Sequence, residues 1–172
     1  MDDQRVPALV GEAMKRTALC WLDYDGGERP RPAWHAWGEG VAYVVSGGPE
    51  QPLPGILAAD RVVVTARAKE SRARLVSWVA TAETLLPWTD DWRDAVAALR
   101  PERLNAVAGE ALADVWAAES TITRLTPTGE LTEQPGDYPS GSLAAPPPGS
   151  PAATRGPSPW VAHRRPRRAP RL

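Results

Sequence analysis

The sequence has little of several residue types, and each scarcity excludes a class of protein. It contains one cysteine among 172 residues, which excludes an intramolecular disulfide and any metal site built from several cysteines. No apolar run approaches the roughly 18 residues of a membrane-spanning helix, and residues 1–20 lack the basic start and apolar stretch of a secretory signal. We therefore expect a cytoplasmic protein without a membrane span.

Catalytic and cofactor-binding motifs are missing as well. The sequence contains no phosphate-binding loop, dinucleotide fingerprint, nucleophile elbow or zinc-ligand spacing. Its two histidines, His35 and His163, do not form a metal-ligand pattern. The adjacent Asp90 and Asp91 are better interpreted as residues at the start of a helix, where carboxylates interact favourably with the helix dipole. The sequence thus predicts no catalytic side chain and no metal site.

What is present indicates one domain followed by a tail. Hydrophobic residues make up 42% of the chain, enough for one core that relies on eight tryptophans and no phenylalanine. Ten of the 19 prolines lie between Pro135 and the C-terminus. A segment of this composition buries too little apolar surface to offset the entropy lost on ordering. We expect a folded domain over residues 1–129 and a disordered tail over residues 130–172.

Charge differs between the two parts. From Thr132 onward six arginines and two acidic residues give a net charge of +4, which leaves −5 of the total of −1 for residues 1–131. The terminal HRRPRRAPR can attract nucleic acid or anionic lipid, but its prolines and the acidic domain favour a solvated tail. A nucleic-acid partner is therefore not expected.

The spacing of apolar residues predicts a mainly β protein of the α+β class, built on an antiparallel barrel with short flanking helices. Residues 47–56 contain three prolines and three glycines and must leave the sheet as an irregular loop, followed by a helical turn near residues 57–59. Pro101 and Pro127 are expected to end the second helix and the last strand. The predicted strands are residues 18–24, 31–37, 41–46, 62–67, 74–85 and 121–126, and the predicted helices are residues 8–16, 89–99 and 110–118.

Four stretches in this order carry a resemblance: CWLDYDGGERPRPAWHAWGEGVAYVVSGG, DRVVVTAR, RLVSWVATAE and STITRLTPTG. Their succession of strands and turns resembles the pyridoxamine 5'-phosphate oxidase-like family, the flavin-binding split barrels, over residues 8–129. The resemblance implies an antiparallel split barrel that forms a homodimer and binds flavin mononucleotide (FMN) in the groove between subunits. It also implies a flavin- or deazaflavin-dependent oxidoreductase, in which the cofactor supplies the chemistry.

The resemblance further implies where the cofactor would lie. Family members carry a basic residue, often lysine, about six residues after the end of the third strand, and this chain has Pro52 there. The turn with Lys69 and Arg72 can supply phosphate contacts instead, although a solvated hairpin tip is the alternative. The implied cofactor-binding residues are Arg31, Ala33, Trp34 and His35 on the second strand, Val45, Ser46 and Gly47 at the end of the third, and Lys69 and Arg72.

Two functions stay open at this point. The first is the flavin or deazaflavin oxidoreductase. The second is a cofactor-free barrel that acts as a small-molecule-binding or protein-interaction module, with an apolar groove lined by Trp34, Trp37 and Trp78. His35 can stack on a ring cofactor or act as a structural histidine, and Cys20 is interpreted as a buried, inert thiol.

Overall fold

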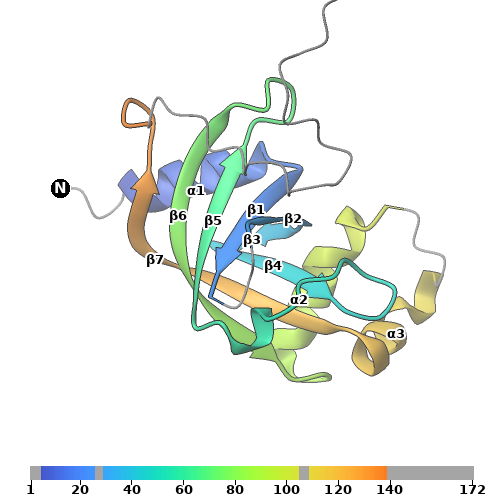
Figure 1. Ribbon diagram of the computed structural model, residues 1–172. Coiled ribbons are helices and arrows are strands. Elements are labelled where there is room, and N and C mark those ends of the chain that lie inside the picture. Colours follow the sequence, from blue (N-terminus) through green and yellow to red (C-terminus); the bar gives the residue numbers. More distant parts are fainter. Residues whose placement is uncertain (1–4, 26–28, 105–108, 139–172) are drawn as a thin grey trace, which may run out of the picture. The chain divides into compact units, whose positions relative to one another are not determined.

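The computed structural model describes residues 5–25, 29–104 and 109–138. Within these residues, seven antiparallel strands form one curled sheet that carries three α-helices (Figure 1), which confirms the expected mainly β, α+β class. Residues 139–172, most of the expected tail, lie outside the described residues. The elements are α1 (Arg5–Lys15), β1 (Leu19–Tyr24), β2 (Arg31–Trp34), β3 (Ala36–Gly38), β4 (Val41–Ser46), the 3-10 turn η1 (Ile56–Ala58), β5 (Arg61–Arg67), β6 (Arg74–Leu85), α2 (Asp90–Glu102), the 3-10 turn η2 (Gly109–Ala111), α3 (Leu112–Glu119) and β7 (Thr121–Glu133).

The sheet closes on itself through one residue. Its strand order is β2-β1-β5-β6-β7-β4-β3, so β2 and β3 are the two edges. These edge strands follow each other in the chain and are separated only by His35. Because one residue joins both edges, the sheet must curl into a barrel. Where β2 comes alongside β4, no strand ladder joins them, and this gap is the seam of a split barrel.

Two hydrophobic cores lie on the two faces of the sheet. The inner core is covered by α1 through Val10, Ala13 and Met14, while the outer core packs α2 and α3 against the other face. Strand β4 contributes to both, because Val44 faces the inner core and Val45 the outer one. The seam therefore lies between two packed layers.

One predicted strand is two strands in the structure. The strand expected over residues 31–37 is interrupted at His35, because its first half pairs with β1 and its second half with β4. A single straight strand cannot reach both partners, so the chain bends at His35. The sequence shows no glycine or proline at this bend.

The last strand is longer than predicted. It was expected to end before Pro127, but β7 continues to Glu133. Pro127 is opposite Ala80, next to a shift in register where β6 and β7 are out of step. The ladder between β4 and β7 ends at Leu125. Pro127 lies beyond this point, so its missing N–H removes no hydrogen bond to β4.

The helices differ from expectation mainly at their ends. Helix α1 begins at Arg5 rather than residue 8, with Pro7 in its first turn, where proline is tolerated. Helix α2 includes Pro101 and ends one residue later, at Glu102. Its start is as expected: the Thr89 hydroxyl accepts a hydrogen bond from the Trp92 backbone N–H.

Candidate functional site

The side chain of Gln51 bridges the seam between β2 and β4. Its Oε1 accepts a hydrogen bond from the backbone N–H of Trp34 at 2.8 Å. Its Nε2 donates to the carbonyl oxygens of Trp34 at 3.0 Å and Val45 at 3.1 Å. The amide thus takes the place of the strand that is missing here and satisfies backbone groups that the sheet leaves unpaired.

The preceding residue, Glu50, places a buried carboxylate behind the seam. Its side chain is only 2% exposed, and it forms an ion pair with Arg103, whose side chain is 25% exposed, at 3.0 Å. The Trp116 indole N–H donates to the same carboxylate at 2.8 Å. A buried carboxylate is tolerated when it has a partner charge and hydrogen bonds, and Glu50 has both.

The aromatic rings of Trp34 and Trp116 lie beside this ion pair. The ring centroids of Trp34 and Trp116 are 6.4 Å apart, and the Arg103 guanidinium carbon lies 6.0 Å from the centre of the Trp34 ring. Arg103 also donates to the carbonyl oxygen of Leu104, which is exposed. The accessible part of the seam is therefore an aromatic and cationic surface whose one positive charge is balanced by Glu50.

Close packing of two glycines holds this loop in place. Gly48 has a φ of +55°, and a Cβ there would lie 2.7 Å from the carbonyl oxygen of Glu119 at the end of α3. The Ser120 hydroxyl donates to the carbonyl oxygen of Gly47 at 3.0 Å. The loop that carries Glu50 and Gln51 is thus fixed against α3 and the start of β7.

The predicted ring-binding residues are divided between the two faces of β2. Ala33 belongs to the inner core and Trp34 packs against the outer core. Arg31 is paired with Leu22 of the inner core, and paired residues of antiparallel strands share a face. The Arg31 Nε is buried and has no hydrogen-bond partner among the described residues.

The third-strand positions end close to Trp34. Val45 is completely buried, and its carbonyl oxygen accepts a hydrogen bond from Gln51, which also binds Trp34. Ser46 is buried opposite Thr121. Gly47 is exposed and has a φ of +87°. Trp34, Val45 and the loop after Gly47 are therefore brought together by the fold.

The two predicted phosphate contacts lie elsewhere. Lys69 and Arg72 are exposed in the turn between β5 and β6, where Arg72 has a φ of +58° and its carbonyl oxygen accepts a bond from Arg67. The other end of β6, at Leu85, pairs through Ile122 with Val45. Strand β6 is 12 residues long, roughly 35–40 Å at ~3.3 Å per residue. Within this chain, the hairpin turn and the seam lie at opposite ends of β6.

The prediction of an apolar groove lined by Trp34, Trp37 and Trp78 is wrong. Trp78 is 1% exposed, and Trp37 packs edge-on against it in the inner core with ring centroids 6.0 Å apart. Trp34 lies on the other face of the sheet. Alternation along a strand separates residues 34 and 37, so these rings cannot line one groove.

His35 and Cys20 are buried in the barrel. Burial lowers the pKa of His35, and a hydrogen bond with the backbone of Met14 partly opposes this effect. Its Nδ1 has no partner among the described residues. Burial raises the pKa of the Cys20 thiol to about 12, so the thiol is protonated at neutral pH, as expected of an inert cysteine. No cluster of metal-binding side chains occurs in the part of the chain that the structure describes.

The sequence reasoning missed Glu50, Gln51, Arg103 and Trp116. From the sequence, residues 47–56 are predicted only to form an irregular loop without a basic residue. One usable signal was present, because an acidic and an amide side chain stand next to each other between prolines and glycines in an otherwise apolar loop. Arg103 and Trp116 gave no such signal, since they follow far along the chain.

The seam does not fit a phosphorylated flavin. A phosphate monoester carries a charge of about −1.5 to −2 at neutral pH and needs free cations or N–H groups. Arg103 is already paired with Glu50, and the backbone groups of Trp34 and Val45 are already bonded to Gln51. Binding FMN here would bring a dianion beside a buried carboxylate.

The fold is that of a split barrel, which solved structures of other proteins share. The heme storage protein HutZ from Vibrio cholerae is similar, with a TM-score of 0.53 and 15% identity over 71% of this chain and 89% of that chain. A candidate 5-nitroimidazole antibiotic resistance protein from Bacteroides thetaiotaomicron has a TM-score of 0.50 and 12% identity over 74% of this chain and 80% of that chain. A candidate pyridoxamine 5'-phosphate oxidase from Listeria innocua has a TM-score of 0.49 and 11% identity over 74% of this chain and 98% of that chain.

At these identities the similarity concerns the fold. No protein-family model matches the chain, and no curated protein sequence matches it significantly. Among the described residues, no helix combines the length and apolar character needed to cross a bilayer.

Proposed function

We propose that this chain is a split-barrel binding protein whose seam accepts a small aromatic molecule without a phosphate group. The observation that carries the proposal is the buried Glu50 carboxylate. It neutralises the positive charge of Arg103, whose guanidinium lies beside the Trp34 ring. A planar, uncharged ligand can stack on the half-buried Trp34 and meet the Arg103 face without needing a free cation. Phosphate-bearing ligands are disfavoured by the same arrangement.

Riboflavin and FMN test this proposal, because they share one ring system and differ in the phosphate. Titration of each into the protein is followed by tryptophan and flavin fluorescence. We expect saturable riboflavin binding and FMN binding at least about tenfold weaker, equivalent to ~1.4 kcal/mol. Equal or tighter binding of FMN, or purified protein whose bound flavin is identified by mass as FMN, would contradict the proposal.

The variant Glu50→Gln tests the role of the buried carboxylate. The amide keeps an oxygen for Trp116 and Arg103 but removes the negative charge, so FMN binding is expected to strengthen about tenfold. Glu130→Gln is the matched control, because Glu130 forms an exposed ion pair with Arg61. If both variants bind FMN like the unmodified chain, Glu50 does not control ligand choice.

A flavin or deazaflavin oxidoreductase is the second candidate. Arg31 favours it, because its half-buried guanidinium has no ion-pair partner among the described residues and its Nε has no hydrogen bond. A phosphate held by Arg31 would lie on the inner face of β2, away from Glu50. In that case Arg31→Gln should abolish FMN binding, whereas Glu50→Gln should leave it unchanged.

Heme, which the similar Vibrio cholerae protein stores, is less compatible with this chain. His35 is the histidine within the described residues, and it is buried in the inner core beneath α1. An axial ligand would need space for the macrocycle beside it. The burial of His35 therefore gives no support for heme binding.

We also infer a homodimer in the cytoplasm. Leu86 is 69% exposed and Trp88 is 49% exposed in the loop between β6 and α2, where Trp88 has a φ of +70°. Two large exposed apolar side chains in one loop favour a protein contact. Light scattering after gel filtration should give twice the chain mass, and Trp88→Lys should reduce it to the mass of a monomer.

A further inference from the structure

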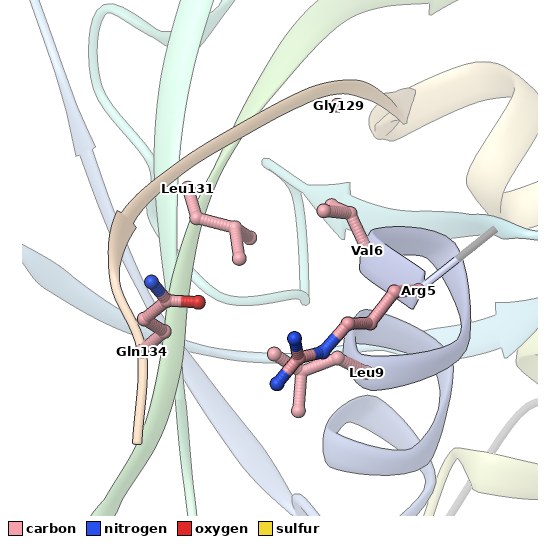
Figure 2. A pocket seen from close by; sticks show the side chains of 6 residues that line it. All are labelled: Arg5, Val6, Leu9, Gly129, Leu131 and Gln134. Carbon is pink, nitrogen blue, oxygen red and sulfur yellow. The ribbon is translucent and has the colours of Figure 1, made fainter. Parts of the chain in front are cut away.

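A groove separate from the seam lies between the start of α1 and the end of β7. Its volume is about 370 Å³, at the lower end of the ~300–1,000 Å³ of small-molecule sites. In Figure 2 the side chains of Val6 and Leu9 from the helix face Leu131 from the strand, while Arg5 and Gln134 extend toward each other. The groove thus has an apolar interior and a polar end.

Among the residues that the structure describes, the polar end of the groove has one cation, Arg5, and no carboxylate. None of the six described residues that line the groove is acidic, and no carboxylate among the described residues forms an ion pair with Arg5. The neighbouring acids on β7 are already paired. Glu130 binds Arg61 at 2.9 Å, and Glu133 binds Arg74 at 2.7 Å.

The start of α1 adds to this positive potential. Among the described residues, the first turn of the helix contains no acidic residue, and a helix N-terminus carries a partial positive charge. Arg5 and Val6 belong to this turn and line the groove. The exposed Arg5 guanidinium, which forms no ion pair with a described residue, and the start of α1 therefore lie beside one apolar groove.

We propose that this groove binds a medium-chain aliphatic carboxylate. The hydrocarbon chain lies between Val6, Leu9 and Leu131, where it is removed from water. The carboxylate accepts hydrogen bonds from the Arg5 guanidinium and from the Gln134 amide. This site does not involve Trp34 or Glu50, so the outcome of the flavin titrations does not affect it.

Calorimetric titration of the full chain with decanoate, below its micellar concentration, tests the proposal. We expect saturable binding of decanoate and at least about tenfold weaker binding of decanol and of decyltrimethylammonium, which lack the anionic group. Arg5→Gln should weaken decanoate binding about tenfold, because it removes one charge-assisted contact. Arg16→Gln is the matched control, since Arg16 is an exposed cation just beyond the other end of the same helix.

A second variant separates loss of binding from loss of folding. Val6→Glu places a carboxylate in the groove. Val6 is half-buried against the inner core, but the new carboxylate stands in the first turn of α1, where negative charge stabilises a helix and offsets part of the lost apolar contact. It should abolish decanoate binding while the circular dichroism spectrum stays unchanged. Absence of saturable decanoate binding to the unmodified chain, equal binding of decanol, or unchanged affinity in Arg5→Gln would each overturn the proposal.

Discussion

Replacing Gln51 by leucine tests whether one side chain holds the barrel closed at its seam. The change keeps the approximate size of the side chain but removes three hydrogen bonds, of 2.8, 3.0 and 3.1 Å, to Trp34 and Val45. Each typical hydrogen bond contributes ~0.5–1.5 kcal/mol to stability. Because Gln51 is half-buried, water can reach part of this region, and we expect a loss of about 2–3 kcal/mol.

Urea unfolding followed by circular dichroism measures this loss, and amide hydrogen exchange locates it. The Trp34 amide, which donates to Gln51, should lose protection more than amides in the β5–β6 ladder. Gln134→Leu makes the same chemical change at an exposed position and should alter stability by no more than ~0.5 kcal/mol. If Gln51→Leu is no more destabilising than Gln134→Leu, Gln51 does not bridge the seam in solution.

Two further predictions concern the loop and the buried histidine. Gly48→Ala should lower the free energy of unfolding by ~3 kcal/mol. Left-handed backbone costs an L-residue ~1–2 kcal/mol, and the new Cβ would also clash with the carbonyl oxygen of Glu119. Gly40 has a φ of +81° and open space around it, so Gly40→Ala should lower the free energy of unfolding only by the cost of left-handed backbone. Equal losses of stability in the two variants would refute the close contact between Gly48 and Glu119. Because the pKa of His35 is lowered from 6.5 in the folded state, the unfolded chain takes up the proton first, and the free energy of unfolding should fall as pH decreases from about 7 to about 5. His35→Gln should flatten this dependence in urea unfolding; an unchanged slope would show that His35 does not cause it.

Local pattern was sufficient for most of the sheet. Strands β4 and β6 begin and end where the sequence indicated, at residues 41–46 and 74–85. The apolar residues of β4 run together between Gly40 and Gly47, and those of β6 alternate up to Pro87; these signals act over a few residues. The order of these segments also sufficed to indicate the split-barrel fold.

Long-range pairing decided the remaining elements. The bend at His35 and the continuation of β7 past Pro127 both depend on which strand lies alongside. Proline normally ends a strand because it lacks an N–H, but at Pro127 the β4 side of β7 is no longer paired. A rule that considers only sequence neighbours cannot register that Pro127 lies opposite Ala80, or that the strands before and after His35 pair with different partners, β1 and β4.

The sequence by itself determined the fold class and singled out Trp34 and Val45; their role in binding stays a prediction. Tertiary structure decided what surrounds them: Gln51 joins their backbones, Arg103 faces the Trp34 ring, and Trp116 reaches Glu50. Strand formation depends on spacing within a segment, which the sequence shows directly. A charge network depends on loops and helices that meet only after the barrel has closed. The absence of a basic residue near Pro52 could therefore be seen in the sequence, whereas the burial of Glu50 could not.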